Sequence, residues 1–371
     1  MPNPLVFLCG ARDFHAMDWY RRAKELLPDK EICILTDLIA GEGFKKLAND
    51  DDIVFKLIII DRLLLNKQSR FGNVWRNVVK LLVFPIQVAL VKRFAVRNPD
   101  ALYYAHSMYY LSLGMAAGIR YVGRPQGSDI LIITYASRLL RYCAVKSMAA
   151  AKAVIVDSNK MKEAIAGFSR ARINIHVIRN GIDLASIKDV TNRSDSEGVK
   201  REAILSIRGL TPLYRISEIV QRRNSSPRYR DAPLTFIYPF YEHKYRRALA
   251  ALLNGADVEL GSLDKVEMYE LLARTKLAIS IPESDSSPRS VYEAVFCGCP
   301  VAITHHPYYD VLPRCMKERI VLVDLTQEDW FDRAMERADE IASTRYSPSD
   351  EALGIFDQNR SFKEMEALLF G

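Results

Sequence analysis

Short apolar runs alternate with helical periods along most of the chain, and this alternation predicts a parallel α/β protein. The runs predicted as strands are residues 5–9, 32–35, 53–60, 101–105, 153–157, 173–178, 203–207, 234–238, 258–260, 277–281, 301–304 and 320–323. Segments with helical periodicity lie between most of them, for example 13–27, 72–96, 138–150, 216–223, 265–273 and 291–296. Strands that alternate with helices are typical of βαβ units, whose strands form a parallel sheet.

A polar stretch at 188–200 (KDVTNRSDSEGVK) divides this pattern into two series. Its composition is that of a linker, so we predict an N-terminal domain over 1–187 and a C-terminal domain over 201–346. Both are expected to be doubly wound. Ligands bind such sheets at the carboxyl ends of the strands, here in a cleft between the domains. The amphipathic tail 347–371 is predicted as a helix that packs back on the N-terminal domain.

Length and composition exclude several classes of protein. The chain has 371 residues, of which 49% are hydrophobic and 26% charged, as in a globular protein of two domains. No apolar window approaches the ~18–20 residues that a membrane span requires. The N-terminus has neither a basic region nor a small-residue cleavage site, so no signal peptide is expected. The six scattered cysteines favour reduced thiols in a cytoplasmic protein.

The net charge of +7 is concentrated in the first half, where residues 1–190 contain 28 Lys and Arg against 17 Asp and Glu. No acid lies between Asp61 and Asp100, and the basic residues there are Arg62, Lys67, Arg70, Arg76, Lys80, Lys92, Arg93 and Arg97. The helix predicted over 72–96 also carries apolar residues, namely Val74, Val78, Leu81, Leu82, Phe84 and Val88. Two interpretations are open. In the first, the apolar residues face the core and the basic ones face solvent. In the second, the helix contacts an anionic membrane surface.

The most informative stretch is 280–304 (SIPESDSSPRSVYEAVFCGCPVAIT). A predicted strand ends at Pro282, and a helix begins at Pro288 after a short polar loop. Exposed amides and the helix dipole make such a start a site for phosphate, which Ser286, Ser287 and Ser290 would surround. Glu293 lies about one and a half turns further on, within reach of a ribose. The alternative is an ordinary strand–loop–helix with a surface glutamate.

This stretch resembles the signature of retaining glycosyltransferase family 4, whose members have the GT-B fold of two Rossmann-like domains facing a cleft. Glu293-Ala294 and Gly298-x-Pro300-Val301 match the signature, and its first acid falls at Asp285, where the family usually has Glu. The resemblance implies that Glu293 binds the ribose of a sugar nucleotide. It implies that Asp285 and the following backbone, from Ser286 to Ser290 with Ser287, Pro288 and Arg289, hold the donor sugar and diphosphate.

Other segments agree with this resemblance. Residues 154–183 are similar to the last strand, helix and NGxD turn of the family's N-terminal domain, with Asn180 in the turn. Gln126-Gly127-Ser128-Asp129 resembles the HGSD loop that faces the donor sugar, with Gln126 in place of His. Arg208 fits the diphosphate-binding Arg, and Arg215, beside Tyr214, is the candidate for the second charge. The nucleotide base would be bound by backbone near Leu260.

Several further positions keep two interpretations. Gly10 follows the first strand and His15 follows Gly10, as in a phosphate or acceptor loop, but His15 also fits a helix start capped by Asp13. His106 ends a strand and belongs to either the cleft or the core. His305 and His306 are expected in a peripheral loop. Asp50-Asp51-Asp52 is expected to be a surface turn, and Cys297-x-Cys299 lacks a second pair, so no metal site is predicted.

The function expected from this resemblance is metal-independent transfer of a sugar, of the hexosyltransferase type, from a nucleotide-diphosphate donor with no further cofactor. The acceptor is a glycan, lipid-linked, in polysaccharide or lipopolysaccharide synthesis at the inner face of the membrane. A GT-B-fold sugar-nucleotide epimerase is the alternative enzyme. Nucleic-acid binding is not predicted, because the basic half contains no recognition module.

Overall fold

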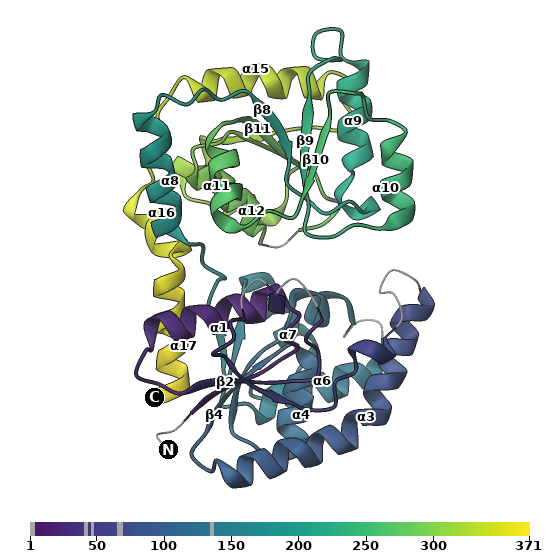
Figure 1. Ribbon diagram of the computed structural model, residues 1–371, viewed down its shortest axis with the longest axis vertical. Coiled ribbons are helices and arrows are strands. Elements are labelled where there is room, and N and C mark those ends of the chain that lie inside the picture. Colours follow the sequence, from purple (N-terminus) through teal and green to yellow (C-terminus); the bar gives the residue numbers. More distant parts are fainter. Residues whose placement is uncertain (1–3, 41–43, 46–47, 65–69, 134–136, 286) are drawn as a thin grey trace. The chain divides into compact units, whose positions relative to one another are not determined.

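A computed structural model describes residues 4–40, 44–45, 48–64, 70–133, 137–285 and 287–371 of the chain (Figure 1). The chain forms two compact units. Unit 1 comprises Met1–Arg179 together with Asn359–Gly371, and unit 2 comprises Asn180–Gln358. Each unit contains a parallel sheet with helices packed on it, which confirms the predicted α/β fold class.

The sheet of unit 1 has the strand order β3-β2-β1-β4-β5-β6-β7, and every neighbouring pair is parallel. Its strands are β1 (Leu5–Leu8), β2 (Ile32–Thr36), β3 (Ile53–Lys56), β4 (Leu102–His106), β5 (Tyr121–Arg124), β6 (Ala153–Val156) and β7 (Ile175–Val177). All four residues of the central strand β1 are buried, because helices cover both faces of a parallel sheet. In β3, at the sheet edge, no residue is fully buried.

Three helices of unit 1 begin at a side-chain cap. They are α1 (Phe14–Leu26), α3 (Arg70–Arg97), α4 (Met108–Ala117), α6 (Arg138–Ala150), α7 (Asn159–Phe168) and, at the chain end, α17 (Gln358–Phe370), with short turns at Asp61–Leu63 and Asp129–Ile133. Asp13, Ser137 and Ser158 each accept a backbone N–H of the first turn of the next helix. Helix α17 contributes Phe362 to the core of unit 1, where its ring stacks on Trp19 at 6.1 Å.

The sheet of unit 2 has the parallel strand order β10-β9-β8-β11-β12-β13. Its strands are β8 (Ala203–Ser206), β9 (Leu234–Ile237), β10 (Val258–Gly261), β11 (Thr275–Ser280), β12 (Val301–Ile303) and β13 (Ile320–Leu322). Its helices are α8 (Leu184–Ser196), α9 (Ile216–Ser225), α10 (His243–Ala250), α11 (Lys265–Ala273), α12 (Arg289–Phe296), α13 (Pro307–Asp310), α14 (Arg314–Lys317), α15 (Trp330–Ala342) and α16 (Asp350–Phe356), with a 3₁₀ turn at Pro212–Tyr214.

The stretch 188–200, predicted as a linker, is helical up to Ser196 within α8. Asp183 caps this helix by accepting the N–H of Ser186, and Ile187 and Val190 are buried in the core of unit 2. Two apolar residues at a spacing of three are enough to pack a surface helix, but too few to distinguish it from a polar linker. The division between the units lies instead at 179/180 and at 358/359.

Of the two alternatives for helix α3, the structure contradicts core packing for four of its six apolar residues. Val74 and Leu81 are exposed rather than facing the core, as are Val78 and Leu82. Lys80 points inward, with Nζ 3.9 Å from the centre of the Tyr109 ring. Lys67 of the predicted basic segment lies outside the described residues. Within the described part of the chain, no helix combines the length and apolar character that crossing a membrane would require.

Gly181 lies where two passes of the chain through unit 2 cross. Ile182 N–H donates to Phe356 O at 2.8 Å, and Gln358 N–H donates to Ile182 O at 3.1 Å. A Cβ on Gly181 would lie 2.3 Å from Gln358 Cα, closer than any real contact permits. The glycine of the predicted Asn-Gly turn is therefore required by this close approach of backbone to backbone.

We expect Gly181→Ala to lower the free energy of unfolding by about 1–3 kcal/mol or more, because the added methyl group must displace backbone rather than a flexible side chain. Urea denaturation followed by circular dichroism measures the change. Gly255→Ala is the control, since nothing lies within 4 Å of the equivalent Cβ. An equal effect of the two substitutions would contradict the proposed role of the crossing.

Candidate functional site

Arg208 lies at the carboxyl edge of the second sheet, where three side chains contact it. It follows β8, and its Nε donates to Ser280 Oγ, at the end of the adjacent strand β11, at 2.7 Å. Its Nη2 donates to the carboxylate of Asp285 at 2.5 Å. The guanidinium also lies 5.6 Å from the centre of the Tyr214 ring. Ser280, which sequence analysis did not single out, therefore helps to hold the predicted diphosphate-binding arginine.

The loop after β11 is held beside the loop after β8. Glu283 N–H donates to Leu213 O at 2.9 Å, and two residues later Asp285 reaches Arg208. Glu283 itself is exposed, whereas the Asp285 side chain is 16% exposed. Of the two acids in this loop, the structure thus brings Asp285 and not Glu283 to the predicted arginine. Ser286 lies outside the described residues.

Helix α12 begins at Arg289, immediately after Pro288, close to the predicted position. No side chain caps its first turn, so the amides there have no side-chain acceptor at the cap position. Ser287 and Ser290 flank this helix start and are half-buried. A helix start without a side-chain cap, with its positive dipole end, is suited to bind an anion.

Glu293 is buried within α12 rather than on the surface, being 5% exposed. Its Oε1 accepts hydrogen bonds from Tyr269 Oη at 3.1 Å and from Arg289 Nε at 3.2 Å. The alternative of an ordinary surface glutamate is therefore wrong. Tyr269 comes from α11, and no local sequence signal at a separation of 24 residues could have identified it.

Tyr308 is a third residue that sequence analysis missed. It lies on α13, after β12, and it is 5% exposed. Its hydroxyl is buried without a hydrogen-bond partner among the described residues. Burial raises its pKa, with Arg208 opposing and Asp285 adding to the shift. The sequence signal that could have identified Tyr308 is its position just after a predicted strand of a parallel sheet, where ligands bind.

The two neighbouring histidines have different surroundings. His306 Nε2 lies 3.1 Å from Pro282 O and 3.2 Å from Thr304 Oγ1, and so connects the ends of β11 and β12. His305 is exposed and pairs with Asp310 at 2.9 Å. The expected peripheral position is correct for His305. It is wrong for His306, which is half-buried and contacts the ends of two strands.

Three other predicted residues of unit 2, Arg215, Leu260 and Asn180, have different surroundings. Arg215 takes a left-handed backbone conformation with φ 52° ahead of α9, and its half-buried side chain makes no hydrogen bond or ion pair to the described residues. Leu260 is exposed on the edge strand β10. Asn180 is half-buried and precedes the crossing at Gly181.

The carboxyl edge of the first sheet brings together three loops of unit 1. Asp13 caps α1 by accepting His15 N–H at 2.9 Å, and it also accepts a hydrogen bond from Gln126 Nε2. His106 Nε2 lies 3.9 Å from Asp13 Oδ2. His106 is 4% exposed, and burial lowers its pKa to about 4, so its imidazole is neutral at pH 7. The His15 side chain is exposed.

Asp129 organises the loop that resembles HGSD. Its Oδ2 accepts the backbone N–H of Met108 at 2.9 Å and that of Gln126 at 3.0 Å. Gly127, which lies between Gln126 and Asp129 in the sequence, is half-buried. Gly10 allows Tyr110 to pack close to the backbone, since a Cβ on Gly10 would lie 2.7 Å from Tyr110 Oη. These residues shape the edge of the first sheet through local hydrogen bonds and close packing.

Side chains of α1 bind the Asp50-Asp51-Asp52 turn. Asp52 accepts hydrogen bonds from Tyr20 Oη at 2.8 Å and Lys24 Nζ at 2.6 Å, and its side chain is fully buried. Cys297 and Cys299 are buried, free thiols. In the part of the chain that the structure describes, no three His, Cys, Asp or Glu side chains are grouped closely enough to hold a metal ion.

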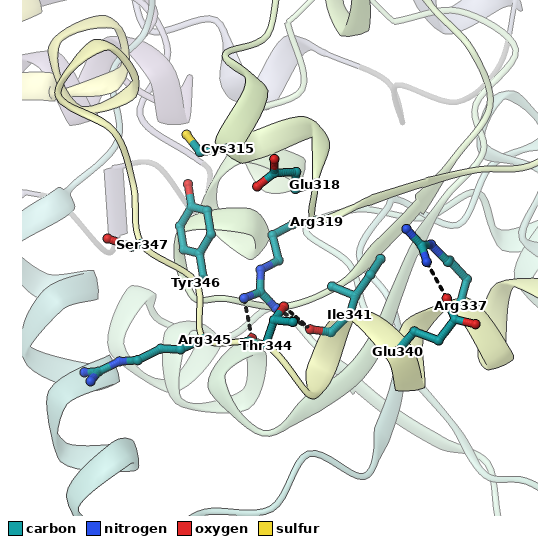
Figure 2. Close-up of a pocket in the computed structure, with 10 residues that line it drawn as sticks. All are labelled: Cys315, Glu318, Arg319, Arg337, Glu340, Ile341, Thr344, Arg345, Tyr346 and Ser347. Carbon is teal, nitrogen blue, oxygen red and sulfur yellow. Dashed lines mark hydrogen bonds and ion pairs between the residues drawn. The ribbon is translucent and has the colours of Figure 1, made fainter.

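A cavity of about 440 Å³ lies at the opposite, amino-end edge of the second sheet, beside β13 (Figure 2). Figure 2 shows Arg319 there, with its guanidinium donating to Ile341 O at 2.9 Å and to Thr344 O at 2.5 Å. Arg337 and Glu340, also among its lining residues, pair with each other. The cavity contains none of the predicted site residues, and its buried arginine already binds two backbone carbonyls.

Comparisons with known proteins agree with the fold. The model of the family described as Glycosyltransferase Family 4 matches residues 63–186, most of which lie in unit 1. No curated protein sequence matches the chain. HepE from Anabaena, solved in complex with UDP-glucose, has 18% sequence identity and a TM-score of 0.69, over 98% of this chain and 99% of HepE.

Two further solved structures show the same similarity. Sucrose-phosphate synthase from Thermosynechococcus elongatus has 12% identity and a TM-score of 0.72, over 99% of this chain and 98% of that one. A UDP-forming α,α-trehalose-phosphate synthase from Burkholderia vietnamiensis has 11% identity and a TM-score of 0.67, over the same shares of the two chains. The resemblance seen in the sequence is thus confirmed: residues 63–186 match glycosyltransferase family 4, and the whole chain has the GT-B fold.

Proposed function

We propose that this protein is a retaining, metal-independent glycosyltransferase of the hexosyltransferase type. It moves a sugar from a nucleotide-diphosphate donor to a lipid-linked glycan in cell-surface polysaccharide synthesis, with no further cofactor. The observation that carries the proposal is the arrangement of Arg208, Ser280 and Asp285 beside the uncapped start of α12. The family match and the UDP-glucose complex of Anabaena HepE support the same class of donor.

The chemistry of the donor explains why this arrangement fits. Breaking the bond between the sugar and the nucleotide leaves a diphosphate, whose negative charge must be neutralised as it develops. Arg208 supplies a fixed cation, and the first-turn amides of α12 supply hydrogen-bond donors and a positive dipole end. Neutralisation by these groups requires no metal ion. Glu293, four residues into the helix from Arg289, is positioned by Tyr269 for the ribose of the same nucleotide.

A panel of nucleotide sugars tests the donor class directly. We expect one of the UDP-, GDP-, ADP- and CDP-sugars to raise the melting temperature, because a ligand that binds only the folded state stabilises it. Incubation with that donor alone should leave the sugar configuration unchanged, whereas an epimerase would invert one of its centres without an acceptor. No stabilisation by any member of the panel would contradict the proposal.

Membrane contact is supported by the outward face of α3. Leu81 and Leu82 are 75% and 69% exposed, and Val74 and Val78 continue the same apolar surface. The exposed residues Lys92, Arg93 and Arg97 follow on this helix, with no acid between residues 62 and 99. An apolar helix face followed by basic residues is typical of helices that lie at an anionic membrane surface. Lys80 and the half-buried Arg76 do not belong to this exposed face.

Replacing Lys92, Arg93 and Arg97 together by Gln is expected to weaken binding to anionic liposomes by roughly 1 kcal/mol per residue. Co-sedimentation with vesicles of phosphatidylcholine and phosphatidylserine measures the loss. The control replaces Lys160 and Lys162, two exposed lysines of α7, in the same way. Unchanged sedimentation of the α3 variant would remove the membrane from the proposal and leave the enzymatic reaction standing.

A further inference from the structure

The cavity of about 440 Å³ in unit 2 lies at the amino-end edge of the second sheet (Figure 2). Residues of α14 and of the turn into β13 form one wall, and the end of α15 with residues 344–347 forms the other. Cavities of about 300–1,000 Å³ typically hold small organic ligands. The ligands of a doubly wound sheet bind at the opposite, carboxyl ends of its strands, so an occupant of this cavity would be neither donor nor acceptor.

The cavity wall contains a buried cation that has no carboxylate partner. Arg319 is 4% exposed, and its guanidinium donates to Ile341 O at 2.9 Å and to Thr344 O at 2.5 Å. Among the described residues, no carboxylate forms an ion pair with it. Burial lowers its pKa, and the neighbouring Arg201 lowers the pKa further, although Glu318 acts in the opposite direction. A buried charge is costly unless it is paired, and the two carbonyls leave other N–H groups of the guanidinium for a ligand.

A second guanidinium lies close to this wall. Arg201 donates to Leu272 O at 3.1 Å and to Cys297 O at 2.8 Å, and it too has no ion-pair partner among the described residues. A Cβ on Gly298 would lie 2.9 Å from Arg201 Nη2 and 3.6 Å from Tyr346 Cβ, so the glycine lets these two residues approach each other. The ring of Tyr346 also lies 5.4 Å from the guanidinium carbon of the buried arginine. Two positive groups therefore lie beside one tyrosine without a carboxylate that pairs with either.

The acids that line the cavity already have arginine partners. Three arginines and two glutamates line it, so its walls carry an excess of positive charge. Glu340 pairs with Arg337, and Glu318 pairs with Arg314 at 3.1 Å. All four of these side chains are more than half exposed. Exposed ion pairs contribute little to stability, so Arg337 can exchange Glu340 for another anion at small cost.

Tyr346 supplies a hydroxyl at one end of the cavity. Figure 2 shows this hydroxyl directed toward Cys315 of α14, whose thiol is a weak hydrogen-bond acceptor. The hydroxyl oxygen is buried without a hydrogen-bond partner among the described residues, and the thiol lies 3.3 Å from Ser349 Oγ. A buried hydroxyl that makes no hydrogen bond is costly, so a ligand oxygen at this end would be stabilised.

We propose that this cavity binds a small organic phosphate, of the size of a sugar phosphate, as a ligand separate from the donor and the acceptor. Arg319 holds the phosphate group, Arg337 turns from Glu340 to a further phosphate oxygen, and the hydroxyl of Tyr346 donates to the ligand. A guanidinium fork matches two oxygens of a phosphate, and two such groups neutralise its double charge. The site lies wholly in unit 2, and the inference does not depend on the proposed transfer reaction.

The half-buried thiol of Cys315 lines the cavity and gives a local measure of its occupancy. Iodoacetamide is added to the full-length protein, and mass spectrometry of the peptides measures alkylation at Cys315 and at the exposed Cys143 of unit 1, the internal control. Saturating glucose 6-phosphate should slow alkylation of Cys315 about tenfold and leave Cys143 unchanged, because the bound form excludes the reagent. Glucose should protect neither thiol. Equal rates at Cys315 with and without glucose 6-phosphate would overturn the proposal.

Calorimetric titration with glucose 6-phosphate gives the dissociation constant independently of the thiol. Arg337→Gln should raise this constant about tenfold, through loss of one charge-assisted contact, and the exposed position of Arg337 keeps the fold intact. Arg333→Gln is the control, because it removes an exposed arginine of the same helix that does not line the cavity. Equal dissociation constants for these two variants would show that the cavity is not the binding site.

Arg319→Lys tests the buried cation itself. It keeps the positive charge but loses the fork, so it should also weaken binding of glucose 6-phosphate about tenfold. The melting temperature of this variant is measured first, because Arg319 also holds the carbonyls at the end of α15. A folded Arg319→Lys that binds as tightly as the unaltered protein would contradict the role given to the guanidinium.

Two comparisons separate this cavity from the donor site and test the chemistry of its ligand. Protection of Cys315 by glucose 6-phosphate should persist in Arg208→Ala, because Arg208 lies at the opposite edge of the sheet. Loss of protection in that variant would place the ligand at the donor site and overturn the inference. Glucuronate, a carboxylate with one charge and one acceptor oxygen fewer, should bind about tenfold more weakly than glucose 6-phosphate. Binding of glucuronate with equal affinity would contradict the assignment to a phosphate.

Discussion

Replacing Arg208 by alanine is expected to lower kcat for sugar transfer by about 100- to 1000-fold, the usual cost of losing one preorganised group that stabilises developing charge. The diphosphate gains negative charge as the sugar leaves, so the cation stabilises the transition state more than the bound donor. KM for the donor should change less than kcat. Steady-state kinetics with the donor identified by the nucleotide-sugar panel measures both constants.

Three companion variants test the reason for this loss. Arg208→Lys keeps the charge but loses the fork that reaches Ser280 and Asp285 together, so it should recover only part of the rate. Arg247→Ala, which removes an exposed arginine of α10, should leave the rate unchanged. Asp285→Asn should lower the rate less than Arg208→Ala, since it leaves the cation in place.

One result would reassign the neutralising role. If the unaltered protein loses its activity in EDTA and recovers it with Mg²⁺, a metal ion rather than Arg208 and α12 stabilises the leaving group. Undiminished turnover by Arg208→Ala would show that the alignment with the family's diphosphate-binding arginine is misplaced. A melting temperature equal to that of the unaltered protein is needed before either result is interpreted.

Glu293→Gln is expected to weaken binding of the donor nucleotide by roughly 1.5–3 kcal/mol for each ribose hydrogen bond that loses its charge, or about 10- to 150-fold. The substitution keeps the size of the side chain, and the amide oxygen can still accept the hydrogen bond from Tyr269. The fold should therefore be retained. Calorimetry with the nucleotide diphosphate measures the loss, and Glu270→Gln on the neighbouring helix α11 is the control.

A comparison of ribose and deoxyribose nucleotides shows whether Glu293 acts through the sugar. The unaltered protein should bind the nucleotide more tightly than its 2′-deoxy analogue, and Glu293→Gln should bind both with similar affinity. Such non-additivity is what a direct contact produces in a double-mutant cycle. If the preference for ribose survives the substitution, Glu293 is not the ribose ligand, and its buried contacts with Tyr269 and Arg289 are structural.

Helix α3 shows where the limits of sequence analysis lie. A run of apolar and basic residues from 72 to 96 predicts a helix, and the structure contains one over Arg70–Arg97. The same run could not show that Lys80 faces Tyr109 while Leu81 and Leu82 face solvent. Helical periodicity identifies which residues share a face, but the partner of each face comes from distant segments of the chain.

The alternation of apolar runs with helical periods by itself determined the two parallel sheets, and the motif at 280–304 by itself determined the helix that carries Glu293. These are local properties, because backbone pairing, caps and periodicity depend on neighbouring residues. Only the tertiary structure decided that Ser280 holds Arg208, that Tyr269 holds Glu293 and that Lys80 packs on the Tyr109 ring. It also decided that 188–196 is a helix, since two buried residues, Ile187 and Val190, pack against a core that the sequence does not display.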